Sequence, residues 1–133
     1  MIRLRNPRRL GRSGAVAAEF AMVIPIVVLL IFGTIQFGII FFANAGLQNA
    51  MGEGARVATL WPPRSQQEIR NALMASRFGI DPAKMATPAI TTGRTAGGQN
   101  FVEIGVSYTT DLNFIFFTVP GITLEHSRRA YVP

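Results

Sequence analysis

The feature that most constrains this chain is an apolar run from Phe20 to Ala43. None of its 24 residues is charged, and only Thr34 and Gln36 are distinctly polar. A helix of this length rises about 36 Å, which is enough to cross a hydrocarbon core about 30 Å thick with some tilt. The run therefore predicts a transmembrane helix, and in a chain of 133 residues it leaves room for one small folded domain.

The basic residues gather in front of this run. Of the net charge of +6, five units come from arginines within residues 1–14, so the rest of the chain carries 6 − 5 = +1. Because cytoplasmic flanks of membrane helices are rich in Lys and Arg, this asymmetry predicts a cytoplasmic N-terminus and an extracytoplasmic position beyond about residue 45. The later basic residues form no stripe with interleaved aromatics, so no nucleic-acid partner is expected. The five arginines are Arg3, Arg5, Arg8, Arg9 and Arg12.

A cleavable secretory signal is the alternative interpretation of this segment. Ala43-Asn44-Ala45 matches the small-x-small pattern of a cleavage site, which would release a secreted protein cut after Ala45. The apolar regions of signal peptides usually run about 7–15 residues. The present run is longer, which favours a retained anchor.

Pro25 lies inside the run, where it removes one backbone hydrogen bond. It predicts either a simple kink or a weak point at which the helix bends when packed among copies of itself. The helical pattern continues beyond the membrane, with small residues at intervals of four that share one face and let another backbone approach closely. These residues are Gly46, Ala50, Gly54 and Ala58.

The second half of the chain predicts a small head of class α+β. The long helix should end near Trp61, because Pro62-Pro63 cannot continue it. Ser65 and Glu68 form a capping box, which opens an amphipathic helix that stops at Gly79.

Residues 102–108 and 122–127 alternate between apolar and polar side chains and predict two antiparallel strands, with 85–91 as a candidate third strand. The Gly- and Thr-rich segment 91–100 is expected to be a loop. Between the two strands, Phe114-Ile115-Phe116-Phe117 predicts either the lid of a small core or a patch that touches a membrane or a partner.

Catalysis finds little support in the sequence. His126 is the only histidine, there is no cysteine, and the seven acidic residues include no close pair suited to act as general acid and base. Metal-ligand spacings are absent as well. We therefore expect no catalytic residue, no metal and no cofactor, and a protein that is not an enzyme.

The start of the helix resembles a known processing site. Gly14, four residues, then Glu19-Phe20 and an apolar helix, all behind a basic leader, resemble type IV prepilins of the Flp, or tight-adherence, branch. The wider stretch from Glu19 to Ala58 is similar to the TadE/TadF-like pseudopilins, in which an acid-aromatic pair, a mid-span proline and a Gly-Ala-Arg triplet recur. The resemblance covers the first half of the chain well.

This resemblance implies cleavage after Gly14 by a membrane-embedded aspartic prepilin peptidase, which leaves a new amine on Ala15. Glu19 lies one helical turn further on, about 6 Å along the axis. One interpretation pairs its carboxylate with that amine, either its own or that of a neighbouring subunit, with Phe20 beside the pair. The other treats Glu19 as an interfacial acid that needs no partner.

Together these patterns predict a pseudopilin or minor pilin of a tight-adherence pilus system, built from a basic leader (1–14), a transmembrane and extended helix (15–60) and an extracytoplasmic domain (61–133). It would lie in a bacterial inner membrane and act through helix packing in pilus biogenesis and surface adhesion. The implied partners are the peptidase, other pilin subunits in a homo- or hetero-oligomer and the assembly platform. A signal-anchored binding domain that is not processed at Gly14 is the alternative from another class.

Overall fold

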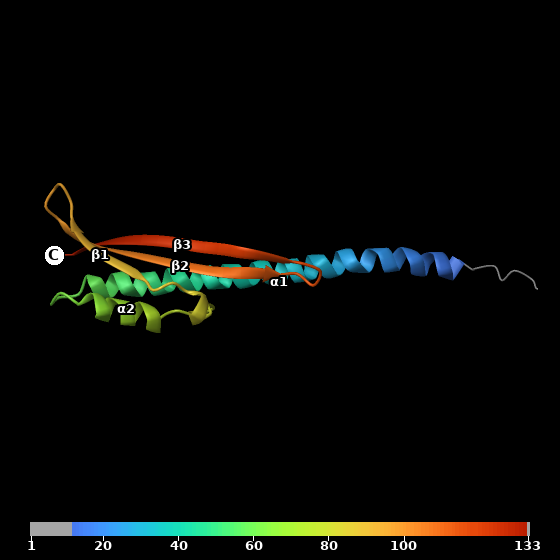
Figure 1. Cartoon of the computed structure of the whole chain (residues 1–133), viewed down its shortest axis with the longest axis horizontal. Coiled ribbons are helices and arrows are strands. Elements are labelled where there is room, and N and C mark those ends of the chain that lie inside the picture. The colour runs from blue at the N-terminus through green and yellow to red at the C-terminus, as the bar shows by residue number, and fades with distance from the viewer. Residues whose placement is uncertain (1–11, 133) are drawn as a thin grey trace, which may run out of the picture.

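The computed structural model describes residues 12–132, and its fold is α+β, as predicted. Most of the predicted basic leader, including Arg3, Arg5, Arg8 and Arg9, lies outside the described residues. A long helix, a short helix and a three-stranded antiparallel sheet follow one another along the chain (Figure 1). The elements are α1 (Arg12–Ala58), α2 (Gln66–Ala75), the 3-10 turn η1 (Pro82–Lys84), β1 (Ala89–Arg94), β2 (Asn100–Asn113) and β3 (Thr118–Val132).

Helix α1 contains 47 residues and passes through Pro25 without ending. It ends at Ala58, slightly before the predicted end near Trp61. The backbone N–H of Thr59 donates to the carbonyl oxygens of both Ala55 and Arg56, which tightens the last turn, and two prolines follow.

The predicted capping box is present at the start of α2. The Ser65 hydroxyl accepts from the Glu68 backbone N–H at 3.2 Å, and the Glu68 carboxylate accepts from the Ser65 N–H at 2.8 Å. The bond from the Ser65 backbone, followed by the one from its hydroxyl, lowers the pKa of Glu68. The helix ends at Ala75 rather than at Gly79, because the Ser76 N–H closes the last turn and a non-helical connection then leads to Gly79, whose φ is +67°.

The sheet has the order β1-β2-β3, and both predicted strands extend further than expected. The third strand exists but lies at 89–94, not at 85–91, and the predicted loop at 91–100 is therefore wrong in its first part. Gly93 pairs with Phe101, whose ring lies where a Cβ on Gly93 would be, at 2.5 Å. Only a glycine admits the ring there, so a segment with loop-like composition becomes an edge strand.

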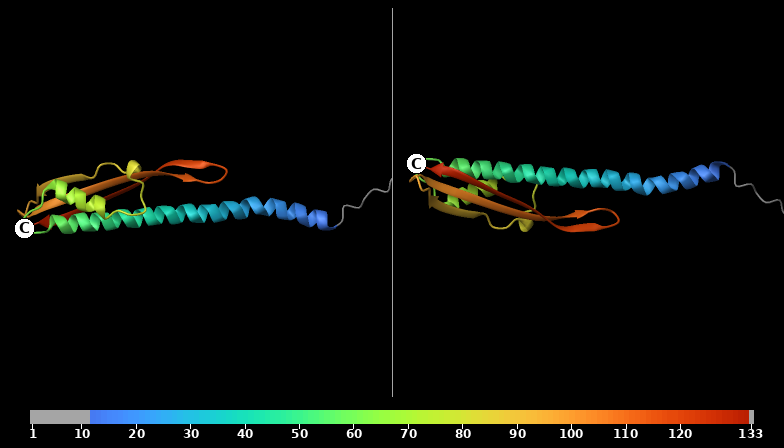
Figure 2. Two further views of the ribbon diagram at one scale, coloured as in Figure 1. Left: turned by 90° about the horizontal axis from the view of Figure 1, so that it is seen from below. Right: turned by 90° about the horizontal axis from the view of Figure 1, so that it is seen from above.

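One face of the sheet packs on the C-terminal half of α1 and on α2, which together form a single core. Figure 2 shows the head lying along one side of that half of α1, while the other half extends beyond it. Every second residue of β2 points into this core, and Ile104 is fully buried between the sheet and the helices. The core comprises Ala43, Leu47, Ala50, Met51, Ala58, Ile69, Leu73, Met85, Ile90, Val102, Ile104, Val106 and Tyr108.

The hairpin of β2 and β3 runs back along α1 toward its N-terminal half (Figure 1). Its end, residues Phe114–Phe117, is called the hairpin tip below. The interpretation of this segment as a core lid is wrong, because Ile115, Phe116 and Phe117 are 55%, 62% and 50% exposed and cover no core residue. The strands are long enough to carry the tip past the end of the core.

Candidate functional site

The residues predicted for processing and subunit pairing lie on the exposed N-terminal turns of α1. Gly14, Ala15, Glu19 and Phe20 are all exposed, and Phe20 is 66% accessible. A Cβ on Gly14 would meet nothing within 4 Å, so packing within the described part of the chain does not require glycine there. The Gly14–Ala15 peptide bond lies inside α1, two residues after its first described residue.

Glu19 accepts no hydrogen bond and makes no ion pair with any side chain that the structure describes. Its carboxylate projects from the exposed surface of α1, next to apolar residues. The structure of a single chain therefore places Glu19 where a group from another molecule can reach it.

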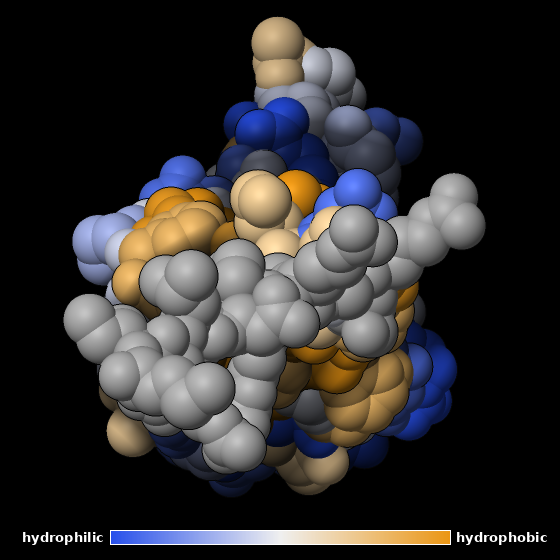
Figure 3. Space-filling model, turned by 90° about the vertical axis from the view of Figure 1, so that its right-hand side faces the viewer, coloured by the Kyte–Doolittle hydropathy of each residue, from blue (hydrophilic) through white to orange (hydrophobic). Residues whose placement is uncertain are grey.

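The apolar run is exposed around the helix rather than packed in a core. The segment Gly14–Ala58 contains an 18-residue window with a mean hydropathy of 2.6, and none of that window is buried. Figure 3, which looks along the molecule from the N-terminal end of α1, shows hydrophobic residues on both sides of the helix and hydrophilic residues at the rim of the head. Pro25 belongs to this exposed surface. A core helix of a soluble domain would bury such a face, so this helix fits a single-pass membrane protein.

The face of small residues turns inward, toward the chain's own head. Ala50 is fully buried, Ala58 is 5% exposed, and both glycines are buried. A Cβ on Gly46 would lie 1.8 Å from the carbonyl oxygen of Phe78, and one on Gly54 would lie 3.3 Å from the Ile104 side chain. The small residues at intervals of four therefore do let another backbone approach α1 closely, as predicted. That backbone is the loop after α2 of the same chain.

His126 and Asn44 join β3 to α1 just beyond the apolar run. His126 Nε2 lies 2.6 Å from Asn44 Oδ1, and because an amide oxygen only accepts, the imidazole donates. The only histidine of the chain thus has a structural partner 82 positions away in sequence, which alternation along the strand could not reveal.

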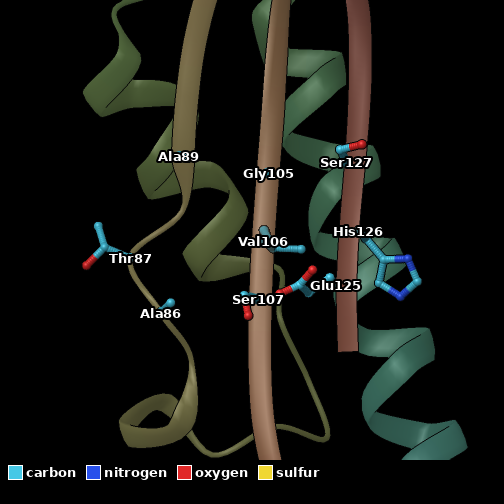
Figure 4. Close-up of a pocket in the computed structure, with 9 residues that line it drawn as sticks. All are labelled: Ala86, Thr87, Ala89, Gly105, Val106, Ser107, Glu125, His126 and Ser127. Atoms are coloured by element: carbon cyan, nitrogen blue, oxygen red, sulfur yellow. The ribbon is translucent and has the colours of Figure 1, made fainter. Parts of the chain in front are cut away.

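A groove with a volume of about 600 Å³ lies on the outer side of the sheet (Figure 4). It is lined by short side chains with Glu125 and His126 at its border, and the imidazole points away from it toward α1. Within residues 12–132, no three His, Cys, Asp or Glu side chains gather into a metal-binding group.

Arg56, the last residue of the Gly-Ala-Arg triplet, pairs with Glu53 one turn earlier. Two hydrogen bonds join them, at 2.6 and 2.8 Å, and they lower the pKa of Glu53 and raise that of Arg56. Both side chains are in contact with solvent, so the pair contributes little to stability. Arg56 remains on the surface of the helix end.

A long exposed apolar helix that carries a small α+β head fits the class of single-pass membrane proteins. The model of the family described as TadE-like protein matches residues 14–56. The resemblance is thereby confirmed for this segment, which is α1 from Gly14 to Arg56, and the chain is TadE-like over its N-terminal helix. No curated protein and no solved structure matches the chain.

Proposed function

We propose that this chain is a pseudopilin or minor pilin of a tight-adherence pilus system, which acts by insertion and helix packing rather than by turnover. The observation that carries the proposal is that the TadE-like match begins at Gly14 and covers the exposed apolar helix. In this proposal the helix lies in the bacterial inner membrane with its N-terminus in the cytoplasm. The head lies outside and contributes to pilus biogenesis and surface adhesion.

Cleavage after Gly14 by a prepilin peptidase is part of the proposal. The open space around Gly14 supports it, since packing among the described residues gives no other reason for a glycine in the first described turn of α1. The Gly14–Ala15 bond is helical, so the peptidase would have to unwind the first turn, and glycine lowers the free energy that this needs.

Pairing of Glu19 with a new amine on Ala15 is the proposed step of assembly. The carboxylate has no partner among the described side chains, and it stands about 6 Å along the axis from Ala15. In a bundle of identical or related helices, the amine of a neighbouring subunit could meet it. Because the small-residue face already packs on the chain's own head, contacts between subunits would use the exposed apolar surface, including Phe20 and Pro25.

The mass of the mature chain tests the processing step. We expect an N-terminus at Ala15, and Gly14→Leu should leave the unprocessed chain in the membrane while its head stays folded. A wild-type N-terminus at Met1 would instead support the anchored binding domain, and one at Gly46 the secreted protein. Release after Ala45 would separate Asn44 from His126 and cut α1 where it packs on the head.

Glu19→Gln tests the pairing step separately. If the carboxylate neutralises an amine inside a packed bundle, its loss leaves that amine unpaired at an expense on the order of several kcal/mol. The variant should then be processed but should fail to co-purify with differently tagged copies or with other pilin subunits. Undiminished association of processed Glu19→Gln would overturn the pairing and leave the processing proposal standing.

A further inference from the structure

The hairpin tip is the most apolar exposed part of the head. Phe114 and Phe117 stack with their ring centroids 4.7 Å apart, and Ile115 and Phe116 form the turn between them. The core lies elsewhere and none of these residues belongs to it. The tip thus presents three bulky apolar side chains, those of Ile115, Phe116 and Phe117, that are half exposed or more.

The tip lies beside the apolar run of α1, not beyond the end of that run. Gln36 Nε2 donates to the carbonyl oxygen of Asn113 at 2.7 Å, and the Phe114 ring comes within 3.5 Å of the position of a Cβ on Gly33. Figure 1 shows the hairpin following α1 to this level. Gln36 is seven residues before Ala43, where the apolar run ends.

The length of helix between Glu19 and the tip is too short to keep both outside the hydrocarbon. The 36 − 19 = 17 residues from Glu19 to Gln36 rise about 25 Å, and a hydrocarbon core is about 30 Å thick. With Glu19 at one boundary, Gln36 lies about 5 Å inside the other boundary and Gly33 about 9 Å inside it. Any tilt of the helix places both deeper.

The apolar side chains of the tip and the paired polar groups just behind its turn suit that depth. The backbone groups of Phe114 and Phe117 bond to each other in both directions, at 2.8 and 3.2 Å. Just behind the tip, the Thr118 hydroxyl donates to Asn113 Oδ1, and Gln36 satisfies the Asn113 carbonyl. The groups just behind the turn are therefore paired, as an apolar medium requires, and only the backbone groups of Ile115 and Phe116 at the turn itself have no hydrogen-bond partner among the described residues.

We propose that the hairpin tip inserts into the head-side leaflet of the bilayer that α1 crosses, so that the chain is held in the membrane at two points. The occupant of this apolar patch is the acyl-chain region just below the lipid headgroups. The inference concerns the chain while it resides in a bilayer and does not depend on the proposed role in a pilus.

Tryptophan fluorescence of the full chain in lipid vesicles tests the insertion. Trp61 is the only tryptophan and lies at the opposite end of the head, 76% exposed. A Trp61→Phe, Phe116→Trp variant moves this probe to the exposed tip. In phosphatidylcholine brominated near the headgroup end of its acyl chain, we expect emission from this variant to be blue-shifted and quenched about twofold, consistent with a depth of about 5–10 Å.

Two controls make the outcome decisive. Wild-type Trp61 should emit as in water and stay unquenched, whereas Trp61→Phe, Phe32→Trp, with its probe on the apolar run, should be quenched. If the Phe32 position is quenched and the Phe116 position is not, the tip is outside the bilayer and the proposal fails. A blue shift at position 116 without quenching, which fades as lipid is added in excess, would mean that a second copy covers the tip, and would also overturn it.

Discussion

Replacing Gly46 by alanine tests the closest approach of the head to α1. The new methyl group would lie 1.8 Å from the Phe78 carbonyl oxygen, and ordinary contact begins at 3.4 Å, so the loop must move by at least 3.4 − 1.8 = 1.6 Å. Both atoms of the loop that it meets first are backbone atoms, which cannot rotate away. Overpacking lowers the free energy of unfolding by about 1–3 kcal/mol, and a clash with backbone atoms belongs at the upper end of that range. Alanine regains about 1 kcal/mol of helix propensity, so the net loss of stability is about 2 kcal/mol.

Gly52→Ala is the matched control, with the same change six residues further along the same helix. Its first neighbour would be the end of the flexible Arg128 side chain at 3.4 Å, so it should be neutral or stabilising by up to about 1 kcal/mol. Thermal unfolding of the full chain in detergent micelles, followed by near-ultraviolet circular dichroism, should lower the melting temperature of Gly46→Ala by about 8 °C or more. Equal melting of the two variants would refute the close contact between α1 and the loop after α2.

Three further tests address the capping box of α2 and the contact between β3 and α1. Ser65→Ala removes the cap of α2 and should cost about 1 kcal/mol, measured by the same melting curves, with no loss expected if the box does not form. The pKa of Glu68 is lowered from its ordinary value of 4.5. The stabilisation that its carboxylate gives to the folded head is therefore complete above pH 4.5 and is lost as the pH falls through the lowered pKa. Glu68→Gln should therefore flatten the acid limb of a stability–pH profile, and an unchanged limb would contradict this. His126→Phe should cost about 0.5–1.5 kcal/mol through the lost bond to Asn44, and Asn44→Ala in the same background should add little more if the two residues act together.

The sequence patterns predicted the elements that rest on local rules. The uncharged run, the capping box at Ser65 and the alternation along β2 each depend on neighbours a few residues apart, and each led to the right kind of element. The same local patterns did not predict strand β1 correctly, because its place at the sheet edge depends on the Phe101 ring of β2, which fits over Gly93. That contact joins different strands, and composition alone indicated a loop.

For the candidate site, too, local patterns predicted some features and missed the contacts between distant parts of the chain. Small residues at intervals of four predict that some backbone comes close, but they do not say which one. Phe78 of the chain's own head takes the place that a second helix would otherwise occupy. The links from Gln36 to Asn113 and from Asn44 to His126 span 77 and 82 positions, and no periodicity signals them. Glu19 has no partner among the described side chains, so its pairing stays a prediction.

The continuity of α1 makes the anchor and the head one mechanical piece. The apolar run passes into the packed half of the helix with no linker, and Gln36 and Asn44 each hold the β2–β3 hairpin. Because each residue of a helix turns by about 100°, inserting a single residue between these two positions would swing Gln36 away from Asn113 while Asn44 kept its partner. The rotational position of the apolar run relative to the head is thus fixed. A rotation of this run about the helix axis therefore turns the outer surface of the head by the same angle.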